Sequence, residues 1–179
     1  SKQRATLRSQ SNGLETIFQI GKGGISDMLV EDNVMNHSDM PFRFKSAPVN
    51  GGGVSNILIR DCAVSDAQQV FVLSTTYSDA NQTVSVEPAV KPAEFANIQA
   101  YNITADVITK NTMSMVADID NTMPYKTYHT HHDLYFQDIA FTNIAKSLAK
   151  KSEVLQGISD TTFYDVTMDW TGIAKEEDD

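Results

Sequence analysis

The sequence predicts an all-β protein, a right-handed parallel β-helix of about five coils stacked along one axis. Five segments carry Asp or Asn five residues apart within one shared apolar pattern, short apolar strands lie between them, and amphipathic helix patterns are almost absent. Such self-similarity is typical of solenoids, in which each coil buries its apolar face against the next. The pairs are Asp27/Asp32, Asn56/Asp61, Asn97/Asn102, Asp133/Asp138 and Asp160/Asp165.

The segments share four apolar columns. Counted from the first Asp or Asn of each pair, positions +1, +3, +6 and +8 are apolar except at Asn33 and Thr161. This alternation predicts two short strands around a turn, with these columns facing the core. Cys62 lies in one of the columns, which predicts a small buried hydrophobe.

A second set of apolar strands lies between the repeated segments, so each coil is predicted to contain about three strands. These strands are 18–20, 42–44, 70–73, 113–116 and 154–155. A doubly wound α/β fold would need helical patterns between its strands. A β-sandwich is the alternative fold, but it offers no reason for the paired Asp and Asn residues. We interpret those residues as turn formers, with calcium ligation as the alternative.

Composition limits the functions that the chain can have. Its 179 residues and 19.7 kDa suit one β-helix domain over residues 1–179. A net charge of −9 disfavours nucleic acid and anionic membrane surfaces as partners, and no apolar run is long enough to span a membrane. The polar, basic first residues suggest an internal cut, so we expect the C-terminal part of a larger β-helix, with 1–12 and 173–179 poorly ordered.

The strand Phe42-Arg43-Phe44-Lys45 is the main candidate for a binding site. Alternation sends Phe42 and Phe44 inward, and it places Arg43 and Lys45 on one outer face about 6.8 Å apart, twice the strand rise. A planar guanidinium beside a point charge is suited to a carboxylate. The alternative is a pair of solvated charges that aid solubility.

Two other segments are weaker candidates. Tyr77 is the aromatic residue of the long insertion 74–92, where it would either pack on a sugar ring or anchor the loop. His129, His131 and His132 precede Asp133 and form a trio that we expect in an exposed loop. Adjacent strand residues point to opposite faces, so the trio does not predict a metal site, and no cofactor is expected.

Several strings in the sequence resemble the polygalacturonases of glycoside hydrolase family 28, and in particular the bacterial exo-polygalacturonases (exo-poly-α-galacturonosidases). The resemblance covers roughly residues 12–170. The strings are Phe18-Gln19-Ile20-Gly21, Met28-Leu29-Val30-Glu31-Asp32-Asn33-Val34-Met35, Arg43-Phe44-Lys45-Ser46, Gly51-Gly52-Gly53-Val54-Ser55-Asn56-Ile57, Thr76-Tyr77-Ser78-Asp79-Ala80-Asn81 and Pro92-Ala93-Glu94-Phe95.

The resemblance implies a pectin-lyase-like parallel β-helix that hydrolyses α-1,4-linked galacturonan, the acidic backbone of pectin, with inversion. Arg43 and Lys45 match the family's Arg-x-Lys motif, which implies contact with the carboxylate of a galacturonate near the cleaved bond. Tyr77 is a further candidate for contact with this substrate. The polymeric substrate implies secretion or export to the periplasm.

The chain departs from the family at the catalytic positions. The family's catalytic acids lie in Asn-Thr-Asp and Gly-Asp-Asp motifs, which occur nowhere in residues 1–179. Glu15 stands at the position of the family's His. We therefore expect the acids upstream and the isolated chain to be inactive. The alternatives are a non-catalytic β-helix that binds pectin or another acidic polysaccharide, and a purely structural β-helix.

Overall fold

The structure of the protein is a computed structural model. It describes residues 24–46, 52–75, 93–117, 131–145 and 153–169, together with short strands formed by residues 6–7, 10–12 and 16–19. The expectations for the remaining terminal residues, for Glu15, for Tyr77 and for His129 fall outside the described residues.

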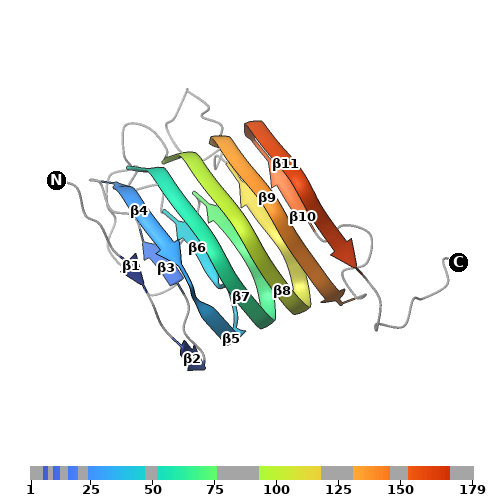
Figure 1. The fold of residues 1–179 in the computed structure, drawn as a ribbon. Helices are drawn as coiled ribbons and strands as arrows, with labels where there is room; N and C mark the ends of the chain where they lie inside the picture. Colours follow the sequence, from blue (N-terminus) through green and yellow to red (C-terminus); the bar gives the residue numbers. More distant parts are fainter. Residues whose placement is uncertain are drawn as a thin grey trace, which may run out of the picture.

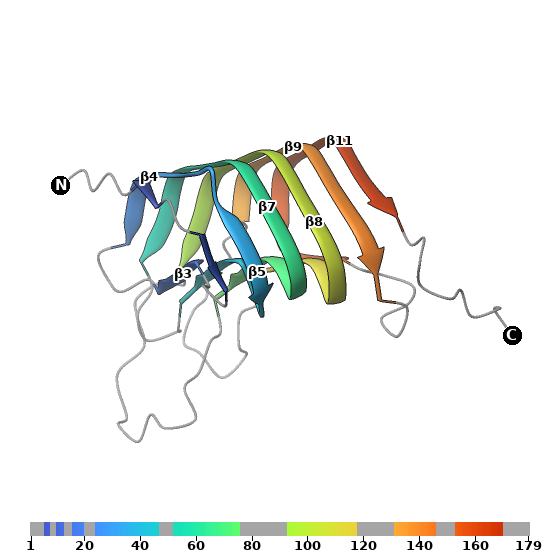
Figure 2. The ribbon, with the colours of Figure 1, turned by 60° about the horizontal axis from the view of Figure 1, so that its bottom comes forward.

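Eleven strands form one continuous sheet that winds around a core (Figures 1 and 2). Every pairing between them is parallel. The strands are β1 (Thr6–Leu7), β2 (Gln10–Asn12), β3 (Thr16–Gln19), β4 (Ile25–Glu31), β5 (Val34–Ser38), β6 (Phe42–Lys45), β7 (Gly53–Ser74), β8 (Glu94–Val116), β9 (His131–Ile144), β10 (Glu153–Gln156) and β11 (Ile158–Asp169).

The pairing order confirms the predicted solenoid. One side of the stack runs β1-β4-β7-β8-β9-β11, while β3 pairs with β6 and β6 with the end of β7. Long strands such as β7 and β8 continue around the corner of the coil, so each supplies residues to both sides of the core (Figure 2). The predicted strands between the repeats are β3, β6, the ends of β7 and β8, and β10.

The paired Asp and Asn residues form the turns of each coil. All ten have a positive φ, between 46° and 59°, a left-handed conformation that short polar side chains tolerate better than most others. This confirms the interpretation of the repeat as a turn signal. The structure adds a third turn five residues further along four coils, at His37, Asp66, Val107 and Asn143.

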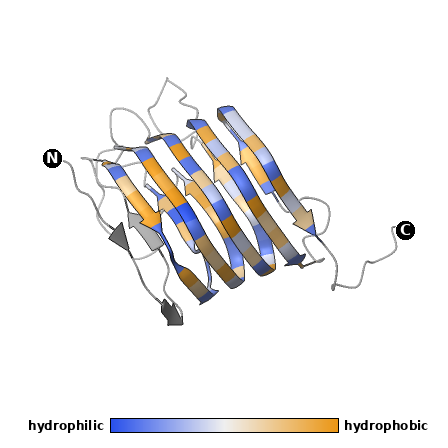
Figure 3. Ribbon diagram, viewed as in Figure 1, coloured by the Kyte–Doolittle hydropathy of each residue, from blue (hydrophilic) through white to orange (hydrophobic). Residues whose placement is uncertain are grey.

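The predicted columns form the core. Val30, Ile59, Ala100 and Phe136 of one column are at most 1% exposed, but Phe163 on β11 is 42% exposed. The described residues leave Phe163 uncovered because β11 is the last strand of the stack (Figure 1). Hydropathy accordingly alternates along the long strands (Figure 3).

Two polar members of the core columns have hydrogen bonds. Asn33 is 3% exposed, and its Nδ2 donates to the Glu31 carbonyl at 3.1 Å while its carbonyl accepts from the Ala63 N–H at 2.9 Å. Cys62 is 4% exposed, as predicted, and its thiol lies 3.2 Å from the Arg60 carbonyl. Burial raises the pKa of the Cys62 thiol. A buried polar group is tolerated when it is hydrogen-bonded in this way.

Aromatic rings connect neighbouring strands of one side of the coil and also connect its two sides. Phe42 on β6 stacks on Phe71 on β7, with ring centroids 5.1 Å apart. Phe71 in turn packs edge-on against Phe136 on β9, at 5.3 Å. These contacts attach β6 rigidly to the core. In the part of the chain that the structure describes, no helix has the length and hydropathy needed to cross a membrane.

Candidate functional site

Strand β6 carries the candidate binding residues on its outer face. It lies between β3 and β7, and Phe42 and Phe44 point into the core with 0% and 2% of their surface exposed. Successive side chains of a strand alternate between faces, so Arg43 and Lys45 share the opposite face. The structure thus brings the two cations together on one rigid strand.

The neighbours of the two cations are given by the register. Arg43 lies beside Ile17 on β3 and Val72 on β7, while Lys45 lies beside Gln19 and Ser74. A hydrogen bond from the Ser46 N–H to the Ser74 carbonyl, at 2.8 Å, extends the pairing of β6 and β7 by one residue. The backbone of Lys45 is therefore held between two paired strands, β3 and β7.

Burial separates Lys45 from an ordinary surface charge. Its residue is 9% exposed, and the adjacent Ser46 and Thr75 are 2% and 5% exposed. Arg43 is half-buried. Lysine is seldom buried to this extent unless its charge is compensated. The interpretation of both residues as solvated charges therefore does not fit Lys45.

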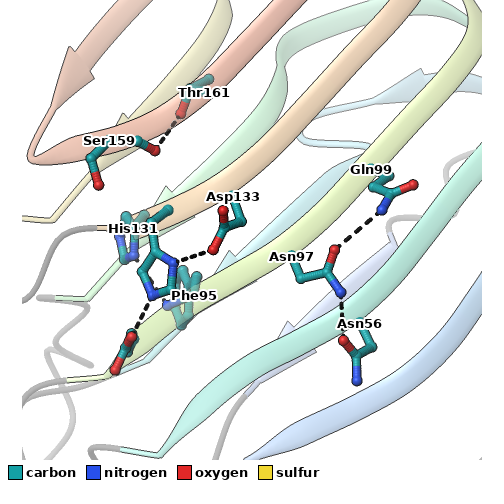
Figure 4. A network of polar contacts seen from close by, with 10 residues as sticks. Asn56, Phe95, Asn97, Gln99, His131, Asp133, Ser159 and Thr161 are labelled. Carbon is teal, nitrogen blue, oxygen red and sulfur yellow. Dashed lines mark hydrogen bonds and ion pairs between the residues drawn. The ribbon is translucent and has the colours of Figure 1, made fainter.

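His131 corrects the expectation of an exposed histidine trio. It is the first residue of β9, not part of a loop, and it is 0% exposed. Its ring lies flat against Phe95, with centroids 4.5 Å apart and planes 5° apart (Figure 4). Nδ1, assigned as the acceptor, accepts a hydrogen bond from the Phe95 N–H at 3.3 Å, and Nε2 donates one to the Val116 carbonyl at 3.0 Å. Burial lowers the pKa of His131 to about 4, so the ring is neutral.

His132 points to the other face, as predicted for adjacent strand residues. Its Nε2 is 2.5 Å from Glu94 Oε1 and its Nδ1 is 2.7 Å from Asp133 Oδ2. The Glu94 carboxylate and then the Asp133 carboxylate raise the pKa of His132. The two carboxylates bind opposite sides of one ring and do not converge. Among the described residues, no group of three or more His, Cys, Asp and Glu side chains could hold a metal ion.

Glu94 is a residue that the sequence did not indicate as a partner for a histidine. It begins β8, and 38 residues separate it from His132. Gly53 lies beside Glu94 in the register of β7 and β8. A Cβ atom at Gly53 would come within 2.7 Å of the Glu94 carbonyl oxygen, so glycine is required for this close approach.

The fold and the cation pair define a class of protein, a parallel β-helix with a candidate carboxylate-binding strand on its outer face. Within that class the chain is 29% identical over 145 residues to the exo-poly-alpha-D-galacturonosidase of Dickeya chrysanthemi, a match that covers 80% of the chain. It also resembles the solved family 28 exopolygalacturonase of Yersinia enterocolitica, with a TM-score of 0.63 and 24% identity over 90% of the chain.

The first match confirms the predicted resemblance to an exo-poly-α-galacturonosidase, and the second confirms the right-handed parallel β-helix fold. The chain spans 22% of the length of the Dickeya protein and 28% of the Yersinia protein. No protein-family model matches the sequence.

Proposed function

We propose that this chain is the substrate-binding part of a polygalacturonase-like glycoside hydrolase that acts on α-1,4-galacturonan by inverting hydrolysis. The observation that carries the proposal is the pair Arg43 and Lys45, which share the outer face of β6. Phe42 and Phe44 fix that strand to the core from the other side.

The cation pair suits a uronate carboxylate. A guanidinium offers a planar fork that matches two carboxylate oxygens, while an ammonium acts as a point charge. Both groups sit on a strand that is paired on both sides, so the backbone that carries them is fixed before a ligand binds. A local pair of this kind lets a protein with a net charge of −9 bind a polyanion, since salt screens the more distant acidic residues.

Hydrolysis itself needs two catalytic carboxyl groups, and the motifs that supply them in the family are missing from this sequence. Inversion requires one protonated carboxylic acid for the leaving oxygen and one carboxylate that activates water. The family's Asn-Thr-Asp and Gly-Asp-Asp strings are absent from the sequence, and Glu15 replaces the family's His. We therefore place the acids on coils that precede this segment in a longer protein. A polymeric substrate outside the cell requires a secreted or periplasmic enzyme.

Binding of trigalacturonate, measured by isothermal titration calorimetry, tests whether Arg43 and Lys45 bind the substrate. The single variants Arg43→Ala and Lys45→Ala should each weaken binding at least tenfold, because a charge-assisted contact contributes about 1.5 to 3 kcal/mol. Arg60→Ala is the matched control. Arg60 is an exposed cation on β7 that pairs with Glu31, and its removal should leave the affinity within about twofold.

Reducing-sugar release from polygalacturonate tests whether the longer protein hydrolyses the substrate. The chain alone should release none, whereas a version extended upstream in its gene should be active. Binding without turnover in the extended protein would favour the non-catalytic, acidic polysaccharide-binding alternative. Unchanged trigalacturonate affinity in the double variant Arg43→Ala/Lys45→Ala, folded by circular dichroism, would overturn both sugar-binding functions and leave a structural β-helix.

A further inference from the structure

A cluster of tyrosine and glutamine side chains occupies the outer face of β8, β9 and β11, across the core from β6. It consists of Gln99, Tyr101, Tyr135, Gln137 and Tyr164, which we call the tyrosine–glutamine platform. Gln99 lies beside Tyr135, Tyr101 beside Gln137, and Gln137 beside Tyr164. The three tyrosines therefore zigzag across three successive strands. Tyr164 is 56% exposed, and the other four residues are half-buried.

The platform is held rigid by its own hydrogen bonds. The Tyr101 hydroxyl donates to Gln99 Oε1 at 3.0 Å, and the Tyr135 hydroxyl donates to Gln137 Oε1 at 2.9 Å. The rings of Tyr101 and Tyr135 are 5.5 Å apart at their centroids and inclined by 37°. Each ring is thus fixed at its polar tip and supported by a neighbouring ring.

A longer chain of hydrogen bonds orients Gln99. Its Nε2 donates to Asn97 Oδ1 at 3.2 Å, and Asn97 Nδ2 donates to Asn56 Oδ1 at 2.6 Å (Figure 4). Asn56 Nδ2 in turn donates to Asp27 Oδ1 at 3.1 Å. The chain crosses three strands and ends at a carboxylate. Four of the five platform side chains, all except Tyr164, are therefore ordered before any ligand arrives, which lowers the entropic cost of binding.

The charges around the platform disfavour an anionic ligand. Exposed carboxylates of the turn columns border it on both sides, and the neighbouring cation, Arg60, is occupied by Glu31 at 2.7 Å. The bordering residues are Asp61, Asp133, Asp138, Asp160 and Asp165, all exposed. A galacturonate chain would be repelled here. An uncharged ligand meets no such cost.

We propose that the tyrosine–glutamine platform binds an uncharged oligosaccharide of pyranose rings. Tyrosine rings pack against the apolar C–H faces of such sugars, while amide and hydroxyl groups at the ring edges exchange hydrogen bonds with sugar hydroxyls. The coils are about 4.8 Å apart, close to the length of one pyranose unit. Successive sugar rings of an oligosaccharide that runs across the strands can therefore lie over the tyrosines of successive strands. A partner protein is a less suitable occupant, because the centre of a protein interface is more apolar than this amide-rich surface.

Calorimetric titration with cellohexaose and with β-1,4-galactohexaose tests the proposal. At least one of these uncharged probes should bind the protein, and Tyr101→Ala/Tyr135→Ala should weaken that binding at least tenfold. Tyr101→Phe/Tyr135→Phe keeps both ring faces and should retain affinity within about fivefold. Arg43→Ala/Lys45→Ala should retain it fully, which separates this site from the proposed galacturonan site.

Three results would overturn the proposal. The first is that neither probe binds the unmodified protein. The second is that the alanine pair, verified as folded by circular dichroism, binds as tightly as the unmodified protein. The third is a concentration-dependent dimer that the alanine pair abolishes in sedimentation experiments, because it would make the platform a contact between protein chains.

Discussion

Val107 on β8 and Asn143 on β9 each directly follow a paired residue of the two strands, Asp106 and Thr142, and both adopt the left-handed backbone conformation, with φ of 59° and 51°. Asparagine adopts this conformation readily, and Asn143 also donates to Asp106 at 2.6 Å. Valine is β-branched and is a genuine outlier there. Val107 is 41% exposed, so little packing compensates for its backbone strain.

Replacing Val107 with Asn should therefore stabilise the protein. We expect a gain of about 1 kcal/mol in the free energy of unfolding, since the left-handed conformation costs most residues about 1 to 2 kcal/mol. Urea unfolding measures the change. The reverse substitution on the next strand, Asn143→Val, should destabilise the protein, because it adds the same strain and removes a hydrogen bond. A Val107→Asn variant less stable than the unmodified protein would contradict this account.

The buried ring of His131 should make stability depend on pH. Burial lowers the pKa of His131 to about 4, whereas an unfolded histidine has a pKa near 6.5. The unfolded chain then binds a proton that the folded protein excludes, so the free energy of unfolding falls as the pH drops from about 6.5 to about 4. The full effect is about 3 kcal/mol. Urea unfolding at pH 7.5 and pH 5.0 should show about 2 kcal/mol of it, because pH 5.0 is about 1.5 units below the unfolded pKa.

Two controls separate His131 from its neighbour. His131→Gln keeps a donor for the Val116 carbonyl and should remove most of the pH dependence in this window. The raised pKa of His132 acts with the opposite sign, since its stabilising contribution is present at low pH and lost as the pH rises through its folded pKa. His132→Gln should therefore not reduce the loss at pH 5.0. An NMR titration giving His131 a pKa near 6.5 would refute the prediction.

The thiol of Cys62 should be unreactive in the folded protein. It is 4% exposed, and burial raises its pKa, so both access and thiolate content are low. We expect its reaction with Ellman's reagent at pH 8 to be at least tenfold slower than in 6 M guanidinium chloride. Equal rates in the two conditions would show that the Cys62 column is not a packed core.

Gly53→Ala should destabilise the protein through a single backbone contact. The added Cβ atom would come within 2.7 Å of the Glu94 carbonyl oxygen, so β7 and β8 must separate locally. Overpacking of this kind costs about 1 to 3 kcal/mol, or roughly 2 to 12 °C in melting temperature for a chain of this size. Ser55→Ala, two residues along the same strand, is the matched control. Equal melting temperatures for the two variants would rule out the close contact as a constraint.

Local patterns in the sequence determined the solenoid and the face that each strand residue occupies. Short polar side chains favour the left-handed turn, so Asp27 and its counterparts indicated the corners of the coils. Alternation then placed Phe42 and Phe44 in the core and Arg43 and Lys45 on the outer face. Both rules act within a few residues, which is why one sequence suffices to apply them.

Only the tertiary structure decided which residues meet between coils and how deeply each is buried. The insertions between coils differ in length, so the pairing of Glu94 with His132 follows from the assembled register. The third turn column contains His37 and Val107 beside Asp and Asn, and it therefore left no uniform signal in the sequence. Burial of His131 and Lys45 depends on neighbours from other coils, because the atoms that exclude water from a side chain are mostly distant in sequence.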